Sequence, residues 1–553
     1  MQSIKNHLNI WTAISIFLLI IFALFIIFPL VLVLCKSVVD PHSGSFTLDY
    51  LTKFFTKKFY WITLVNSLKV TTCATILAAA IGLPLAYLMR SIKITGSSWL
   101  NILIVISYLS PPFIGAYAWI QLLGRNGFLT NYINALFGIK FDGIYGFAGI
   151  VLVFTLQSFP LVYMYVAGAL KNMDNSLNEA AESLGCGRFK RLQKIITPLV
   201  MPTLLASSLL IFMRVFADFG TPMLIGEGYK TIPVLIYTQF MSEVGGDDGF
   251  AAALCLIVIV LTIFLFLAQR FMASRSTYAM TALKPLVPQK ATGIKNILAH
   301  LFVYSIVALA IIPQFIVIYT SFLANNGGQV YTGGFSLQSF EATLFAKDNS
   351  CILNTYLLGL AAITIIVVLG IFISYLTVRK KNTLNNALDT ISMFPYIIPG
   401  SVLGIAFLFA FNKPPLLLSG TALILIISFA IRRMPYTIRS SNAIIGQISP
   451  SIEEAAISLG ATEMKTFRKV TVPMMMPGVL AGAIMSWVTV ISELSSSIIL
   501  YTDTTQTLSI AIYTEVIRGN YGNASAYSTI LTITSILSLL LFFKLTGKRD
   551  VSL

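Results

Sequence analysis

The chain has 553 residues, of which 57% are hydrophobic and only 10% are charged. Soluble domains carry about 25% charged residues, so this composition excludes a soluble enzyme and a soluble nucleic-acid-binding protein. The formal net charge of +16 then needs another explanation, because basic residues in a membrane protein serve to hold loops on the cytoplasmic side.

A helix needs roughly 20 apolar residues to cross a bilayer. Runs of that length predict an all-α polytopic membrane protein with about twelve transmembrane helices. The first run is too long for a signal peptide and no Ala-x-Ala site follows it, so we expect an uncleaved helix. In chain order the runs are 10–34, 62–89, 99–123, 146–168, 198–225, 250–270, 297–320, 352–378, 388–411, 418–438, 473–500 and 526–543.

Lys and Arg gather in alternate connections between these runs. The positive-inside rule places such connections in the cytoplasm, together with both chain termini. The largest cytoplasmic groups are then 171–194, 270–295, 379–381 and 432–469, with Arg432 and Arg433 counted in the last.

An internal repeat divides the chain. Glu-Ala-Ala-Glu-Ser-Leu-Gly at 179–185 recurs 275 residues later as Glu-Ala-Ala-Ile-Ser-Leu-Gly at 454–460, and Pro198 and Pro202 recur as Pro473 and Pro477. Each half has six runs, an even number, so the halves cross the membrane in the same sense about a pseudo-two-fold axis along the membrane normal. We predict halves at 1–272 and 297–553, joined by a cytoplasmic linker at 273–296.

Each Glu-Ala-Ala segment lies in the predicted cytoplasmic loop after the fourth run of its half. Ser176 and Ser451 are predicted N-caps, with Glu179 and Glu454 three residues on as in a capping box. Gly185 and Gly460 are predicted to end these short helices in the left-handed conformation.

These loops resemble those of the membrane subunits of type I (MetI-like) ABC importers, whose signature is Glu-Ala-Ala, a Gly three residues further on, and a later apolar-x-Pro. The resemblance covers about 62–272 and 352–541. It implies that each loop is a coupling helix that docks on an ATP-hydrolysing subunit. The implied coupling residues are Glu179, Ala180, Gly185, Glu454, Ala455 and Gly460.

No ATP site is predicted in this chain. A phosphate-binding loop needs Gly-x-x-x-x-Gly-Lys followed by Ser or Thr, and the pair Gly547-Lys548 is followed by Arg549. The chain is therefore expected to be a transporter subunit rather than an enzyme and to bind no cofactor, with ATP and magnesium in the partner. The expected partners are two copies of a cytoplasmic ABC ATPase, an extracytoplasmic substrate-binding protein and the lipid bilayer, with no nucleic acid.

Acidic residues inside membrane spans are functional candidates because burying a charge is costly. Asp218 and Glu493 occupy equivalent places in the fifth run of each half, about 30 Å from the proline that starts it, which predicts a position near the outer mouth. Arg214 is expected to pair with Asp218 one helical turn away, whereas Glu493 has no local counter-ion.

Tyr237 and Tyr513, which follow the fifth runs, complete the candidate pathway or outer gate. Both are also explained as interfacial aromatic residues. Five scattered cysteines and three histidines indicate no disulfide framework or zinc site, and no metal site is assigned.

Among type I importers, single chains with two fused halves look most like ferric iron permeases of the bacterial cytoplasmic (inner) membrane. The stretch Asp-Phe-Gly-Thr-Pro at 218–222 is similar to what those carry. Permeases for thiamine, aminoethylphosphonate or polyamines remain alternatives. An ion-coupled secondary transporter would need charged residues near the midplane and a basic loop after its second span, and a membrane enzyme would need a cluster of catalytic groups.

Overall fold

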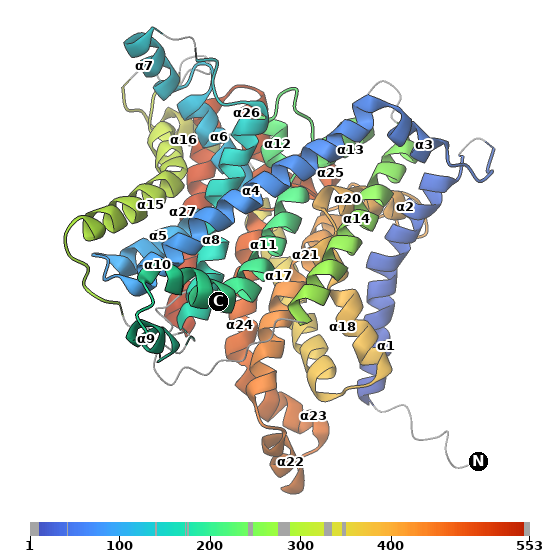
Figure 1. Cartoon of the computed structure of the whole chain (residues 1–553). Helices are drawn as coiled ribbons and strands as arrows, with labels where there is room; N and C mark the ends of the chain where they lie inside the picture. The colour runs from blue at the N-terminus through green and yellow to red at the C-terminus, as the bar shows by residue number, and fades with distance from the viewer. Residues whose placement is uncertain are drawn as a thin grey trace, which may run out of the picture.

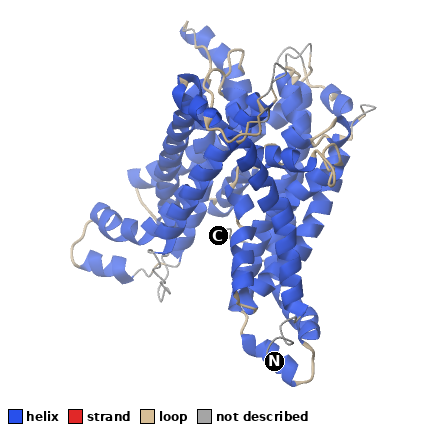
Figure 2. Ribbon diagram, turned by 90° about the vertical axis from the view of Figure 1, so that its right-hand side faces the viewer, coloured by secondary structure: helices blue, strands red, loops and turns tan. Residues whose placement is uncertain are grey.

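The computed structural model describes residues 10–40, 43–138, 141–171, 173, 176–241, 247–274, 288–325, 334–345 and 350–546. Within these ranges every regular element is a helix, and extended backbone pairs only in three isolated bridges. Figures 1 and 2 show long helices packed side by side, with short helices at both ends of the bundle. Most of the predicted linker lies outside the described residues.

The first half begins with one long apolar helix that contains a π-helical turn. Its elements are α1 (Ile10–Phe22), η1 (Ala23–Ile27), α2 (Phe28–Val38), α3 (Asp49–Thr56), α4 (Lys58–Ser91), α5 (Ser97–Leu109), α6 (Pro112–Leu123), α7 (Phe128–Phe137), α8 (Gly146–Lys171), α9 (Ser176–Ser183), α10 (Arg188–Arg191), η2 (Leu192–Ile196), α11 (Thr197–Phe216), α12 (Gly220–Ile225), α13 (Ile232–Phe240) and α14 (Asp248–Ser274).

The second half repeats this order. Its elements are α15 (Ile294–Ser321), α16 (Gln338–Leu344), α17 (Cys351–Arg379), α18 (Thr383–Ser392), α19 (Phe394–Ile397), α20 (Gly400–Phe411), α21 (Ala422–Gln447), α22 (Pro450–Ser458), α23 (Glu463–Thr466), η3 (Phe467–Thr471), α24 (Val472–Ile491), α25 (Ser497–Leu500), η4 (Asp503–Thr505), α26 (Leu508–Ile517) and α27 (Tyr521–Thr546).

The duplication is visible in these bounds. The π-helical turn η3 and the helix α24 that follows it begin and end 275 residues after η2 and α11. In both copies a proline occupies the first turn after the π-helical turn.

Most of the predicted spans correspond to single long helices, and two of them correspond to bent pairs of helices. Nine helices within the described ranges are long and apolar enough to cross a membrane, and two more spans are bent pairs, at 97–137 by 99° and at 383–411 by 110°. Both pairs break before a proline, Pro111 or Pro399, because the residue before a proline is disfavoured in helical conformation. The predicted span 418–438 corresponds to α21, which carries three arginines and is not among the helices apolar enough to cross a membrane, so a twelfth span stays a prediction.

The first span of each half packs against the other half. The buried side chains of α1 and α2 share one hydrophobic core with α17, α20 and α21, whereas those of α15 share another with α4 and α8. The boundary predicted at 272 separates the halves in the sequence, whereas each of the two hydrophobic cores contains helices from both halves. An exchange of this kind leaves no periodic signal in the sequence of either half.

A polar contact fastens α1 to the second half. The Trp11 indole N–H donates to the Glu463 carboxylate at 2.6 Å, and Lys380 forms an ion pair with the same carboxylate at 2.8 Å. The Trp11 ring also lies against the rings of Tyr375 and Phe467. The beginning of the chain is thus held next to α23, directly after α22.

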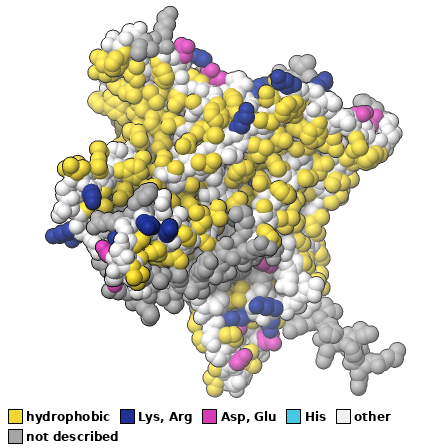
Figure 3. All heavy atoms as spheres, viewed as in Figure 1, with side chains coloured by type: hydrophobic (Ala, Val, Ile, Leu, Met, Phe, Trp, Pro, Cys, Tyr) yellow, Lys and Arg dark blue, Asp and Glu magenta, His cyan; other side chains and the backbone are white. Residues whose placement is uncertain are grey.

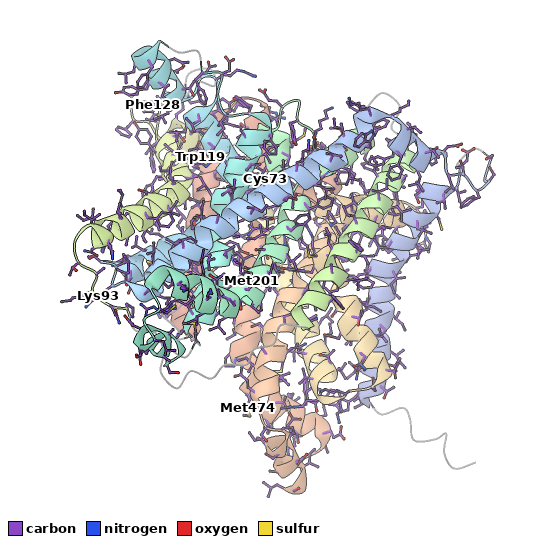
Figure 4. The ribbon with its side chains drawn as sticks, viewed as in Figure 1. Cys73, Lys93, Trp119, Phe128, Met201 and Met474 are labelled. Atoms are coloured by element: carbon purple, nitrogen blue, oxygen red, sulfur yellow. The ribbon has the colours of Figure 1, made fainter. Side chains whose placement is uncertain are left out.

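The two Glu-Ala-Ala helices, α9 and α22, project from the same end of the bundle (Figures 1 and 2). Met201 of α11 and Met474 of α24 lie toward this end, as does Lys93 between α4 and α5, whereas Phe128 of α7 lies at the opposite end (Figure 4). Hydrophobic side chains cover the flank between the ends, and charged side chains gather at the rims (Figure 3).

Close packing inside the second half depends on glycine. A Cβ at Gly482 would lie 2.5 Å from the Thr437 backbone Cα, whereas a Cβ at Gly446 would meet nothing within 4 Å. We expect Gly482→Ala to force α24 from α21 and destabilise the protein by about 1–3 kcal/mol, because overpacked cores must shift backbone. Gly446→Ala is the matched control and should leave stability unchanged or slightly higher. Thermal unfolding of the detergent-purified chain measures both; equal midpoints would contradict the packing assignment.

Candidate functional site

A cavity of about 190 Å³ lies between the two halves, with room for several water-sized molecules. Residues of both halves line it: the ends of α5 and α11 from the first half, and α19, α21 and α24 with the segment that follows α24 from the second. Its charged lining residues are Arg214, Asp218, Arg432, Arg433 and Glu493.

Glu493 is the most enclosed of these charges, with only 2% of its side chain exposed. One carboxylate oxygen pairs with Arg432 and the other with Arg433. The first oxygen also accepts from the Ser496 backbone N–H at 3.2 Å. The prediction that Glu493 has no local counter-ion agrees with these contacts, because both partners come from another helix, α21.

Arg432 and Arg433 lie within α21, with 12% and 18% of their side chains exposed, so counting them with a cytoplasmic loop was wrong. Arg432 stands ten residues after Ala422 and fifteen before Gln447. At 1.5 Å per residue it lies about 15 Å from one end of α21 and about 22 Å from the other. The signal that could have found the pair is their position inside the predicted span 418–438.

Glu493 follows the end of a long helix. α24 together with α23 and η3 forms a continuous helix from Glu463 to Ile491, and Glu493 pairs with arginines near the middle of α21. The sequence prediction measured the depth from the proline at the start of the fifth run, whereas the helix begins before that proline. The position of Glu493 near an outer mouth stays a prediction.

Arg214 and Asp218 are not joined as predicted: no ion pair within the described ranges links them. The Arg214 guanidinium lies 4.7 Å from the centre of the Tyr108 ring, and the Asp218 carboxylate accepts from the Thr221 backbone N–H at 2.9 Å. The reason is local, because α11 ends at Phe216 and the i,i+4 helical spacing is lost before Asp218.

Tyr237 and Tyr513 approach each other through a third aromatic residue. Their rings lie 4.6 Å and 6.1 Å from the ring of Phe219, which is fully buried next to Asp218. Neither tyrosine lines the cavity. They pack where the two halves meet, and a direct contact with cargo remains a prediction without support from this arrangement.

The two halves contribute unequally to the cavity. At the repeat offset, Gln157 and Ser158 of α8 stand where α21 has Arg432 and Arg433, and Thr489 stands where α11 has Arg214. Tyr108 and Tyr396, which stand 288 residues apart in the two halves, both line the cavity. The tyrosines and the acidic positions are therefore duplicated, whereas the three arginines are not.

The C-terminal ends of α9 and α22 have the predicted geometry. Gly185 has φ +77° and Gly460 has φ +88°. The Cys186 N–H donates to the Ala181 carbonyl and the Ala461 N–H to the Ala456 carbonyl, at 2.9 and 3.1 Å. Glycine is the residue that adopts this conformation without a steric penalty, so both loops turn sharply at the same point.

The N-terminal ends differ from the prediction. The cap of α22 is Ser449, whose side chain accepts from the Ser451 N–H, and Pro450 is the first helical residue. Ser451 is therefore not the cap, because the proline already starts the helix one residue earlier. Ser176 is the first residue of α9, and residues 174–175 before it lie outside the described ranges. Glu179 and Glu454 are exposed on their helices, as are Ala180 and Ala455.

One leucine in each loop was missed by the sequence reasoning. Leu184 and Leu459 directly precede the two glycines and are 87% and 89% exposed, the largest fractions among the exposed large hydrophobic residues described. Exposed apolar residues at matched points indicate a surface that another protein covers. The signal available in the sequence was that leucine stands at the same position in both copies of the repeat.

Different ion pairs hold the two loops. Glu453 of α22 pairs with Arg379 at 2.9 Å, and Arg379 also donates to the Ile448 carbonyl at 2.7 Å. In the first half Glu182 of α9 pairs with Arg191 at 2.6 Å. The second loop is thus fixed to α17, whereas the first is fixed within itself.

Comparison with known proteins adds a family to this geometry. A model described as binding-protein-dependent transport system inner membrane component matches residues 78–278 and 366–547. The chain is 28% identical over 539 residues to the ferric transport system permease protein FbpB of Actinobacillus pleuropneumoniae, covering 96% of this chain and 77% of that one.

Two shorter relatives each match part of the chain. The molybdenum transport system permease protein ModB of Escherichia coli K12 is 31% identical over 218 residues, which is 38% of this chain and 93% of that one. The putative 2-aminoethylphosphonate transport system permease protein PhnU of Salmonella typhimurium is 26% identical over 262 residues, which is 47% of this chain and 91% of that one.

Proposed function

We propose that this chain, which belongs to the family of binding-protein-dependent transport system inner membrane components, carries ferric iron as the permease of an ABC importer. Membership and the apolar helices make it a multi-pass permease of the inner membrane. Both family segments lie in one chain, as in a fused two-half form. The relative that covers 96% of this chain is named for ferric transport, whereas the one named for molybdenum covers 38%.

The observation that carries the proposal is the pair of matched loops. α9 and α22 project from one end of the molecule, end in the same left-handed turn and present one exposed leucine each. Two equal docking points suit two copies of a separate ATPase subunit, one beneath each half. This end is then the cytoplasmic one, and both termini lie in the cytoplasm by the same orientation.

In this account a binding protein delivers cargo at the opposite end. ATP binding draws α9 and α22 together, and the helices that follow them, α11 and α24, transmit this movement to the cavity. The residues proposed to make the coupling contact are Glu179, Ala180, Gly185, Glu454, Ala455 and Gly460. ATP and magnesium belong to the ATPase subunit and not to this chain.

Aminoethylphosphonate remains a second candidate cargo. A relative named for it is 26% identical over 262 residues, and the cavity holds three guanidinium groups that could contact a phosphonate. Thiamine and polyamines gain no comparable support, since none of the relatives described above is named for them.

The coupling proposal is tested by Glu179→Lys/Glu454→Lys. Both carboxylates are exposed in the middle of the two docking helices, so charge reversal should reduce co-purification of the ATPase subunit without changing the amount of permease in the membrane. Glu341→Lys, an exposed acid of α16 outside both loops, is the control. Full recovery of the ATPase with the double variant, together with undiminished transport, would remove these residues from the interface.

A further inference from the structure

The charges that line the cavity do not balance. Three guanidinium groups, of Arg214, Arg432 and Arg433, face two carboxylates, of Asp218 and Glu493. The formal charge of the lining is therefore +1. A positive enclosed site attracts anions and opposes the entry of cations, because low-dielectric walls strengthen the field of each unbalanced charge.

The second half contributes more positive than negative charge to the lining. Glu493 spends both carboxylate oxygens on Arg432 and Arg433, and its contact with Ser496 occupies one of them further. One negative charge thus serves two positive charges. Such an arrangement cannot offer Glu493 as a ligand to a cation without releasing at least one guanidinium group.

The first half adds a third guanidinium group, that of Arg214. Arg214 lies over the Tyr108 ring, and no carboxylate among the described residues pairs with it within ion-pair distance. Asp218 is the one carboxylate of the lining that no guanidinium group pairs with, and it accepts from Thr221. An unpaired arginine and an unpaired carboxylate therefore face the same space, from the end of one helix.

A bare trivalent cation fits these charges poorly. Entering the lining at +1, it would bring the enclosed charge to +4, with only Asp218 open to it. A cargo that presents oxyanion groups instead lowers the total, and guanidinium groups are the preferred partners of such groups.

We propose that cargo enters this cavity with an oxyanion, which contacts Arg214, either as a free oxyanion or as a metal ion that retains oxyanion ligands. The proposal deepens the proposed function, on which it rests for passage of cargo through this cavity. For a metal complex, Asp218 faces the metal side of the cargo while Arg214 faces the anion.

The test compares uptake by cells that express the complete transporter with Arg214→Gln, Arg214→Lys or Asp218→Asn. The probes are ⁵⁵Fe(III) supplied with ³²P-phosphate, and ⁹⁹Mo-molybdate alone. We expect Arg214→Gln to lower uptake at least tenfold, Arg214→Lys to lower it less, and Asp218→Asn to raise the entry of a free oxyanion, because it removes a negative charge from the lining. Arg125→Gln is the control, since Arg125 is exposed and pairs with Glu227 away from the cavity.

A rescue separates charge from folding. Thr489 lines the same cavity at the position equivalent to Arg214, so Arg214→Gln/Thr489→Arg restores the charge from the other half. Recovery of uptake to at least half of the original level is expected, with equal amounts of each variant in the membrane. Absence of rescue at equal membrane levels would overturn the role assigned to the charge.

The labels distinguish the possible outcomes. Iron and phosphate entering together support a metal complex, and molybdate entering without iron supports a free oxyanion while overturning the ferric assignment. Iron uptake that Arg214→Gln leaves equal or raises, and that Asp218→Asn lowers, overturns the anion proposal but not the ferric one. If none of the three labels is taken up, both the ferric proposal and the oxyanion proposal are overturned.

Discussion

Replacing Leu184 and Leu459 together by Asp is expected to abolish ATP-driven uptake while the chain remains folded in the membrane. Both leucines are almost fully exposed next to the left-handed turns of α9 and α22, so neither contributes to the permease core. Burial of a leucine in an interface contributes about 1.5–3 kcal/mol, and introducing a carboxylate there adds a desolvation cost. Two such losses should reduce affinity for the ATPase subunit by more than a hundredfold.

The matched control is Leu48→Asp/Leu337→Asp. These leucines are 49% and 56% exposed and lie one in each half, before α3 and α16, outside the two loops. Uptake and ATPase co-purification are measured for both double variants at equal membrane levels. Wild-type uptake by Leu184→Asp/Leu459→Asp would mean that the ATPase subunit couples to the permease through other residues.

Glu493→Gln is expected to destabilise the permease more than any other single change in the cavity. It removes the one carboxylate that neutralises Arg432 and Arg433 in a buried position. Removing one partner of a buried ion pair costs about 3–5 kcal/mol because the remaining charge stays uncompensated. The thermal midpoint of the detergent-purified chain should fall by roughly 5 °C or more.

The first half supplies the control for this change. Arg432→Gln/Arg433→Ser/Glu493→Asp copies the residues Gln157, Ser158 and Asp218 of the equivalent positions. Because the first half folds with that set, the triple variant should recover most of the lost stability. A Glu493→Gln chain as stable as the original would show that the triad is not the buried ion pair described.

The sequence predicted the features that repeat along the chain. The offset of 275 residues relates η3 and α24 to η2 and α11, and the predicted left-handed conformation of Gly185 and Gly460 is confirmed. These are local properties: hydrophobic runs set the helices, and only glycine adopts the turn freely. They could be predicted because each depends on residues close together in sequence.

The contacts of the charged residues could not be predicted in the same way. Glu493 meets arginines sixty residues earlier, and which helix faces it depends on tertiary packing. Arg214 and Asp218 are close in sequence, yet the end of α11 at Phe216 separates them. A helical spacing rule holds only while the helix continues, and no residue near Phe216 marks the end of α11 sharply.

The exchange of first spans also escaped the sequence. Trp11 meets Glu463 although the two residues lie far apart in the sequence. Hydrophobic periodicity shows that a helix has a face to bury but not which partner covers it. The exchange matters for the account because it fastens the first span beside α22, where the ATPase is proposed to dock.

Photo-cross-linking from the loops tests the central claim most directly. A photoreactive amino acid placed at position 184 or 459 of the full chain is illuminated in membranes that contain the whole transporter. The account predicts an adduct with the ATPase subunit from each position, and none from position 337. Adducts with lipid alone from both loops, in membranes where the transporter is active, would contradict the claim that α9 and α22 receive the drive.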